Sequence, residues 1–291
     1  MKQVFLVILL AFGFVVGAQN KIVKKPKKQK PATTQVAPKK HKSQSKPTKG
    51  GTVKCVATKA SYSNGTLTVN GIKYNMVWVD GGTFRMGATS EQGSEISDEK
   101  PVHSVTLSGY YIGKTEVTQA LWQAVMGSNP SYFEGDDLPV EQVSWDDCQE
   151  FIRKLNSLTG QNFRLPTEAE WEFACRGGNN SRGYKYSGSN YIDNVAWYDG
   201  NSGWKTHPVA TKSPNELGIY DMSGNVWEWC ADWYGDYSSG RQTNPKGPYG
   251  GSGRVNRGGS WYNFARNCRS SIRIDDYPTY RDDLLGLRLA L

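Results

Sequence analysis

The chain has 291 residues and a formal net charge of +8, but residues 1–54 hold 13 lysines and no acidic residue. Subtracting these 13 charges from +8 leaves −5 for residues 55–291, and a mildly acidic folded part argues against a domain that reads nucleic acid. The three histidines, one of them in the lysine-rich segment, are too few for a three-histidine metal centre. The 32 glycines, 10 tryptophans and 16 tyrosines are typical of a loop-rich fold and not of a helical bundle.

The first residues predict an export signal. Lys2 precedes an apolar run from Val4 to Val16, and a Gly-Ala pair follows it. This pattern is typical of a secretory signal peptide, here residues 1–18, and the run is short for a membrane span. We therefore expect a bacterial protein that is exported to the periplasm, the cell surface or the medium. An uncleaved membrane anchor is the alternative.

Residues 19–54 are rich in Lys, Pro, Thr and Ser and contain few large apolar side chains. Such a segment buries too little surface to offset the entropy of ordering it, so we expect a disordered stem. It is either a solvated linker or a tether to an anionic envelope surface, because clustered lysines are attracted to such surfaces. Residues 55–291 are expected to form a single α+β domain.

Alternating apolar runs bounded by Gly and Asn predict three strands: residues 66–69, 72–79 and 104–112. Three capping patterns predict helices that begin after Thr115, after Ser144 (S-x-x-D with Asp147) and after Thr167 (T-x-x-E with Glu170). From residue 176 onward Gly, Asn, Pro and aromatic residues dominate, so we expect irregular loops around short twisted strands there.

Six motifs follow one another along residues 75–291: WVDGGTFRMG (78–87), EKPVHSVTLSGYYIGKTEVTQALW (99–122), LPVEQVSWDDCQEF (138–151), RLPTEAEWEFACRGG (164–178), PNELGIYDMSGNVWEWCADWY (214–234) and RVNRGGSW (254–261). In this order they resemble the formylglycine-generating enzyme family, also called sulfatase-modifying factor. The resemblance implies a single low-regularity α+β domain related to C-type lectins.

Enzymes of that family carry two cysteines, five apart, shortly after the GGS motif. The pair binds Cu(I) and activates oxygen to convert a substrate cysteine to formylglycine. Here the first position is Asn263 and the second is Cys268. Because Cu(I) prefers two soft thiolates, one cysteine and a neutral amide do not make this site. The resemblance then implies a vestigial pocket of Trp227, Ser260, Asn263 and Cys268 without copper, and an oxidase remains the disfavoured alternative.

The resemblance also implies structural Ca²⁺. One site uses oxygen atoms of Asp221, Gly224, Val226 and Glu228, and a second uses Asn194, Val195 and an acceptor near Asn201. Hard oxygen ligands on a tight turn suit Ca²⁺, and a loop held by hydrogen bonds alone is the alternative. The same resemblance places Cys230 and Cys268 near one another, so we expect a disulfide between them in an oxidising compartment.

The last thirty residues, 262–291, contain no Lys, Glu, Gln, Met or Trp. This pattern resembles the variable region of diversity-generating retroelement proteins, which use the same lectin-like fold. It implies a ligand-binding surface at Tyr262, Asn263, Phe264, Asn267, Ile272, Asp275, Asp276, Tyr277, Tyr280, Asp282 and Asp283. Independently of this resemblance, tyrosine rings beside Asp and Asn side chains are the mixture found in antibody paratopes. The alternative is an ordinary C-terminal segment whose aromatic rings are buried in the core.

These observations together predict an exported, non-catalytic protein that binds a protein or a glycan through residues 262–284. A formylglycine-generating oxidase and a structural accessory protein of the envelope are the two alternatives.

Overall fold

The computed structural model describes residues 58–93 and 97–291, which belong to one compact unit. The predicted signal peptide (1–18), the predicted stem (19–54) and Cys55 lie outside these residues. Within this part of the chain, no helix combines the length and the apolar character that crossing a bilayer requires.

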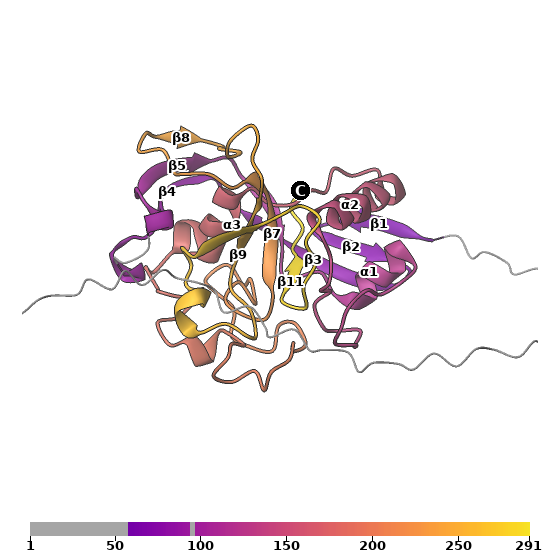
Figure 1. Ribbon diagram of the computed structural model, residues 1–291. Coiled ribbons are helices and arrows are strands. Elements are labelled where there is room, and N and C mark those ends of the chain that lie inside the picture. The colour runs from indigo at the N-terminus through magenta and orange to yellow at the C-terminus, as the bar shows by residue number, and fades with distance from the viewer. Residues whose placement is uncertain (1–57, 94–96) are drawn as a thin grey trace, which may run out of the picture. The chain divides into compact units, whose positions relative to one another are not determined.

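The described residues form three sheets and three α-helices (Figure 1). In spatial order the first sheet contains β1 (Ala60–Ser63), β2 (Thr66–Val69), β3 (Ile72–Val79) and β6 (Tyr110–Gly113). The second contains β10 (Arg273–Asp276), β9 (Arg254–Arg257), β7 (Trp227–Trp233) and β11 (Leu285–Leu287). The third contains β4 (Gly82–Met86), β5 (His103–Leu107) and β8 (Gln242–Thr243). The helices are α1 (Gln119–Met126), α2 (Trp145–Thr159) and α3 (Glu168–Cys175).

Two of the predicted strands, 66–69 and 72–79, are confirmed as β2 and β3. The predicted strand 104–112 is wrong, because this stretch forms two strands in different sheets. β5 pairs with β4, and β6 pairs with β3. Between them the amide of Ser108 donates to the side-chain oxygen of Asn244 and not to a neighbouring strand. The alternation of apolar and polar residues along 104–112 does not reveal that the neighbouring strand changes within this stretch.

The first helix begins later than predicted, and its cap is Thr118 instead of Thr115. The hydroxyl of Thr118 accepts a hydrogen bond from the amide of Leu121. The residues before it are extended, and the amide of Val117 donates to the carbonyl of Leu287 in β11. Tertiary pairing with β11 therefore keeps the first residues of this segment out of the helix.

The caps of α2 and α3 are confirmed, and both are complete capping boxes. The side chain of Ser144 accepts from the amide of Asp147, whose carboxylate accepts from the amide of Ser144. Thr167 and Glu170 do the same at α3. After α3, the helices of the described chain are only short 3-10 turns, as the composition predicts.

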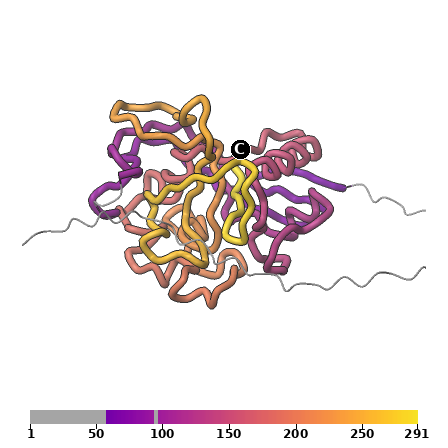
Figure 2. The backbone as a smooth tube through the Cα atoms, in the orientation of Figure 1, coloured from indigo at the N-terminus to yellow at the C-terminus, as the bar shows by residue number. Residues whose placement is uncertain are grey.

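The C-terminal residues pair with elements that lie much earlier in the sequence. β11 runs parallel to β7, with Leu285 beside Trp227. Ala290 and Arg164 exchange backbone hydrogen bonds. Figure 2 shows the yellow C-terminal segment returning into the middle of the described unit. Residues 262–284 therefore connect β9 to β11 of the same sheet, and they include its edge strand β10.

The predicted disulfide is wrong, since the four described cysteines are free and buried. Cys230 lies on β7 and packs in the hydrophobic cluster that contains Trp171 and Phe173. Cys268 instead packs with Tyr186 and Val195 in a separate cluster. The two thiols occupy different parts of the core, although the resemblance implies that their motifs lie near one another in the fold.

Candidate functional site

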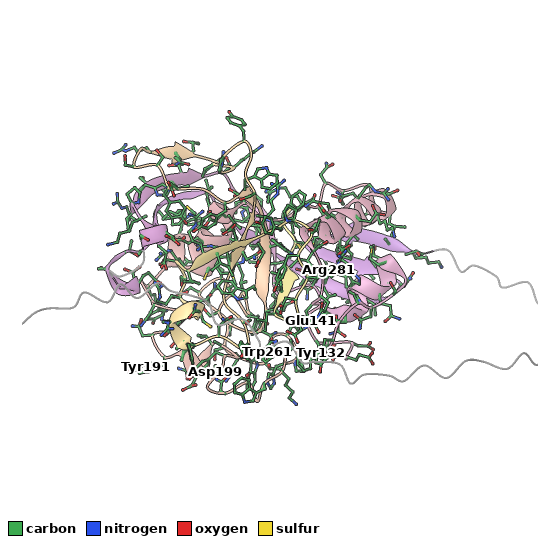
Figure 3. All side chains as sticks on the ribbon, in the orientation of Figure 1. Tyr132, Glu141, Tyr191, Asp199, Trp261 and Arg281 are labelled. Carbon is green, nitrogen blue, oxygen red and sulfur yellow. The ribbon has the colours of Figure 1, made fainter. Side chains whose placement is uncertain are left out.

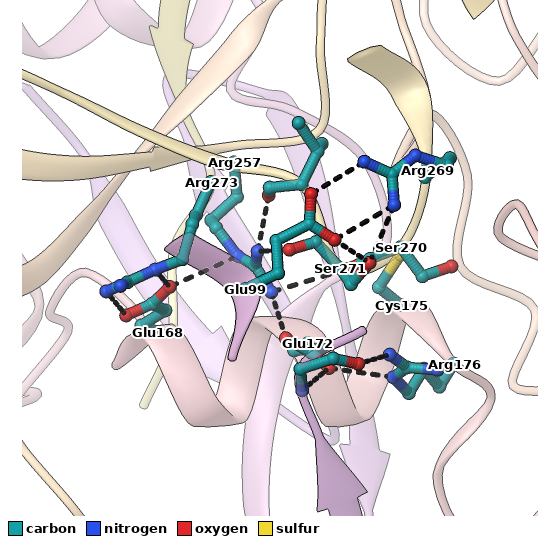
Figure 4. Close-up of polar contacts among 12 residues, drawn as sticks. Glu99, Glu168, Glu172, Cys175, Arg176, Arg257, Arg269, Ser270, Ser271 and Arg273 are labelled. Atoms are coloured by element: carbon teal, nitrogen blue, oxygen red, sulfur yellow. Dashed lines mark hydrogen bonds and ion pairs between the residues drawn. The ribbon is translucent and has the colours of Figure 1, made fainter. Parts of the chain in front are cut away.

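Four buried arginines form a framework around the C-terminal segment, each paired with a glutamate. The pairs are Arg257 with Glu172, Arg269 with Glu99, Arg273 with Glu168, and Arg288 with Glu228. Figure 4 shows the first three of them. The guanidinium of Arg269 binds Glu99 through two hydrogen bonds of 2.9 and 2.6 Å. Bidentate pairs of this kind fix orientation as well as charge, so the backbone around residues 269–273 is rigidly placed.

The residues of the predicted vestigial pocket lie together. The indole Nε1 of Trp227 donates to Oδ1 of Asn263 at 2.8 Å, and the hydroxyl of Ser260 donates to the same oxygen at 2.6 Å. Cys268 is buried next to the backbone of Ser260, and burial raises the pKa of its thiol to about 12. A protonated thiol beside an amide oxygen with two donors does not fit Cu(I), which needs two thiolates.

The first predicted calcium set does not fit a cation in this geometry. Glu228 accepts hydrogen bonds at both oxygens, from the guanidinium of Arg288 and from the indole of Trp171 at 2.6 Å. Asp221 accepts from the amide of Ala210 at 2.7 Å, and burial raises its pKa to about 6. Arg288 already supplies the positive charge at Glu228. Glu116, the carboxylate beside Val226, accepts hydrogen bonds from the amide of Val226 and the side chain of Asn225, so both carboxylates are engaged within the protein.

In the second predicted calcium set, the side chain of Asn201 is already hydrogen-bonded within the protein. Val195 is buried, whereas Asn194 is exposed. The side-chain oxygen of Asn201 accepts from the amide of Tyr198, and its nitrogen donates to the carbonyl of Ala196. Across residues 58–93 and 97–291, no three His, Cys, Asp or Glu side chains are grouped so that they could hold a metal ion.

The predicted ligand-binding residues divide by exposure. Phe264, Asp275 and Tyr277 are exposed; Tyr262, Asn267, Asp276, Tyr280 and Asp282 are half-buried; Asn263, Ile272 and Asp283 are buried. Ile272 packs in the main hydrophobic cluster and is not available to a ligand, which corrects that prediction. Residues 268–273 around it are all buried, and exposed positions alternate with half-buried ones from residue 274 to residue 282, a difference that composition does not reveal.

Two parts of the predicted surface lie together and a third lies apart. The indole Nε1 of Trp261 donates to the carbonyl of Asp283 at 3.0 Å, which joins Tyr262 to the turn before β11. Asp276 instead pairs with Arg254 at the far end of β9, away from Ser260. The candidate binding face is therefore the surface around Tyr262, Phe264 and the turn, without β10.

An aromatic ladder extends this face beyond the C-terminal segment. It consists of Tyr132, Phe133, Trp261, Tyr262 and Trp204, and its consecutive ring centroids lie 4.9, 5.4, 5.5 and 5.4 Å apart. Figure 3 shows Tyr132 beside Trp261 at the lower edge of the unit. Tyr132 is 63% exposed and Trp204 is 61% exposed. The hydroxyl of Ser202 donates to the carbonyl of Trp261 at 2.7 Å, so the loop that carries Trp204 is anchored to the ladder.

Sequence reasoning missed Tyr132 and Trp204. Both lie in loops far from residue 262 in the chain, the first between α1 and α2 and the second before β7. Aromatic rings in Gly- and Asn-rich loops are the only signal in the sequence. That signal does not distinguish exposed rings from buried ones.

A cavity of about 320 Å³ lies elsewhere, between the third sheet and the end of β7. Its lining includes His103, Asp232, Tyr237, Lys246 and Arg273. None of the predicted site residues lines it. We therefore assign the candidate site to the exposed face and not to this cavity.

Comparisons with known proteins agree with this fold. Residues 67–291 match the Sulfatase-modifying factor enzyme 1-like domain. The chaperone protein LppX of Paenibacillus barcinonensis is 37% identical over 262 residues, which cover 73% of this chain and 86% of that protein. The formylglycine-generating enzyme of Mus musculus is 30% identical over 285 residues, which cover 74% of each. The solved structure of Treponema denticola variable protein 1 has a TM-score of 0.70 and 38% identity, and the match covers 77% of this chain and 97% of that chain. The chain therefore belongs to the sulfatase-modifying factor (formylglycine-generating enzyme) family, with its C-type-lectin-like α+β fold.

Proposed function

We propose that this protein is an exported, non-catalytic binding protein, and that its ligand is a protein or a glycan held on the aromatic ladder and the adjoining C-terminal residues. The observation that carries this proposal is the exposure of Tyr132 and Trp204 at the two ends of a row of packed rings, whose central ring, Trp261, is buried and supports them. Rigid amphipathic rings contribute large contact areas at low entropic cost and dominate many interfaces. The half-buried Asp282 accepts one hydrogen bond at each oxygen, from the hydroxyl of Tyr280 and the amide of Leu284, and its remaining lone pairs can accept from a ligand.

The pocket beneath the face supports binding over oxidation. Asn263 stands where the oxidases have a cysteine, and its oxygen is already occupied by Trp227 and Ser260. A peptide containing the CxPxR sequence, incubated with the protein, Cu(I) and oxygen, tests the oxidase alternative. We expect no formylglycine by mass spectrometry. Conversion of the peptide would overturn the non-catalytic assignment.

The direct test is a screen of glycan arrays and displayed peptide libraries with the whole protein. A double variant, Tyr132→Ala with Trp204→Ala, should lose at least tenfold in affinity for any ligand found. Tyr249→Ala is the matched control, since Tyr249 is also a fully exposed ring but lies in the loop beside the cavity. Equal loss in the control, or no loss in the double variant, would contradict the assigned face.

Variation of the C-terminal segment is a separate part of the proposal. The name of the Treponema denticola protein, a variable protein, supports it, as does the absence of five residue types from 262–291. Deep sequencing of codons 262–284 across one culture tests it. We expect substitutions at exposed positions such as Phe264 and Tyr277, opposite AAC-type codons in a near-copy of the segment, and an invariant segment would refute diversification.

The lysine-rich residues 19–54 are proposed to tether the protein to an anionic envelope surface. Vesicles with anionic lipid should bind the exported chain at low salt and release it at high salt, because exposed charges are screened. A protein that lacks residues 19–54 should not bind. Binding that is independent of salt would contradict the tether.

A further inference from the structure

Glu141 is a buried carboxylate without an ion pair. Its side chain is 0% exposed, and Oε1 accepts a hydrogen bond from the amide of Phe133 at 2.8 Å. The other oxygen, Oε2, is buried and has no hydrogen-bond partner. Buried Glu99, Glu172 and Glu228 each have an arginine instead. An unsatisfied buried carboxylate oxygen is costly, so its retention at this place needs an explanation.

The groups around Glu141 add negative charge. Asp282 and Asp283, in the turn before β11, act on it electrostatically. Burial, followed by these two carboxylates, raises the pKa of Glu141 to about 8. The nearby guanidinium of Arg281 is held by Asp147 through two hydrogen bonds of 2.6 and 2.7 Å. Among residues 58–93 and 97–291, no ion pair involves Glu141 or Asp282.

The same carboxylates are joined to the aromatic ladder. Phe133, whose amide binds Glu141, packs its ring edge-on against Trp261. The indole of Trp261 in turn binds the carbonyl of Asp283. Figure 3 shows Glu141 close to Trp261 and Tyr132 on the same side of the unit. A surface of aromatic rings with carboxylates behind them attracts cations through both cation–π and Coulomb interactions.

We propose that this acidic–aromatic cluster, formed by Glu141, Asp282, Asp283 and the ladder, receives the ammonium or guanidinium group of a lysine or arginine of a protein partner, and that binding releases the proton of Glu141 to solvent. The inference rests on the proposed function and specifies the chemistry of its ligand. The cation lies over the half-buried Asp282 and the rings, and it favours the ionised form of Glu141 behind them. Each bound cation therefore turns one carboxylic acid into a carboxylate, with the proton passing to buffer.

The test uses an acetylated hexalysine peptide as the probe and the whole protein. Isothermal titration at pH 7.5 in phosphate and in Tris measures proton exchange, because these buffers have different ionisation enthalpies. Wild-type protein should release protons, and Glu141→Gln should bind without releasing any. Asp282→Asn should weaken binding roughly tenfold, the loss of one charge-assisted hydrogen bond. Equal binding heats in the two buffers for the wild type would overturn the inference.

A second measurement needs no variant. The affinity of wild-type protein for hexalysine should rise about tenfold between pH 6.5 and 8.5, as Glu141 ionises; a flat profile would contradict the proposal. Hexaglutamate should not bind. If a glycan binds the ladder and hexalysine does not, the cationic-ligand inference fails while the proposed function stands. If the double variant of Tyr132 and Trp204 weakens the binding of no ligand, the proposed function is wrong, and the cationic-ligand inference that rests on it is wrong too.

Discussion

Asn263 lies where the family resemblance implies a cysteine, and its side chain makes structural contacts at this position. Its amide oxygen accepts hydrogen bonds from the indole of Trp227 and the hydroxyl of Ser260, two groups that are themselves buried. A cysteine at this position would offer a weak acceptor to both donors. The asparagine therefore forms a hydrogen-bonded link between β7 and the segment after β9.

Asn263→Ala should lower the free energy of unfolding by about 2–4 kcal/mol, because it leaves two buried donors without an acceptor. Urea unfolding followed by tryptophan fluorescence measures this change. Asn267→Ala is the control, since Asn267 is half-buried and its side chain makes none of these contacts. An unfolding midpoint equal to that of the wild type would show that the link does not contribute.

The pH dependence of stability should carry the signature of Glu141. Folded Glu141 keeps its proton up to about pH 8, whereas the unfolded carboxyl ionises near about 4.3. A folded pKa above the unfolded one means that the stabilisation is present at low pH and is lost as pH rises through 8. Relative to Glu141→Gln, the wild type should therefore lose stability from pH 5 to pH 8. Thermal midpoints of both proteins across this range check the sign, and parallel curves would contradict it.

Among the elements, α1 differs most from what its sequence predicts. Both Thr115 and Thr118 can cap a helix, and local pattern does not choose between them. Thr118 is the cap because the amide of Val117 donates to the carbonyl of Leu287 in β11, which keeps residue 117 outside the helix. The caps of α2 and α3 were predictable because each box lies within four residues. The break of residues 104–112 was not predictable, because it depends on pairing with β4 and β3.

The two threonines give a direct test of this assignment. Thr118→Ala should destabilise the protein by about 1 kcal/mol through loss of the cap to Leu121, as is typical of N-cap residues. Thr115→Ala should cost less than half as much, because its hydroxyl donates only to the adjacent carbonyl of Glu116. Chemical denaturation of both variants compares them. A larger loss of stability for Thr115→Ala than for Thr118→Ala would indicate that the helix begins after Thr115, as the sequence predicts.

At the scale of the whole domain, sequence motifs predicted the family fold but not the binding face. The motifs cover the four glutamates of the framework and Arg257, whereas Arg269, Arg273 and Arg288 follow the last motif. The ladder joins Tyr132, Trp204 and Tyr262 from three separate loops, and no local pattern connects these positions. Burial of Ile272 and the separation of Cys230 from Cys268 likewise follow from tertiary packing alone.

Calcium should have little effect on the folded domain. Arg288 already neutralises Glu228, and its guanidinium also donates to the carbonyls of Gly113 and Tyr220. We expect the thermal midpoint to stay the same when EDTA or millimolar Ca²⁺ is added. Differential scanning calorimetry with Mg²⁺ as the matched cation checks this. A rise of the thermal midpoint with Ca²⁺ but not with Mg²⁺ would support the predicted calcium sites.

The parallel pairing of β11 with β7 also sets the order of events during synthesis. Leu285 and Leu287 are buried against strands that leave the ribosome earlier, and Ala290 completes the hydrogen bonds of Arg164 and Ile112. Until these last residues emerge, β7 and the segment around Arg164 have an open edge in a growing chain. We therefore expect this sheet to be completed only after residues 285–290 have left the ribosome, and the uncovered edge of β7 favours aggregation until then.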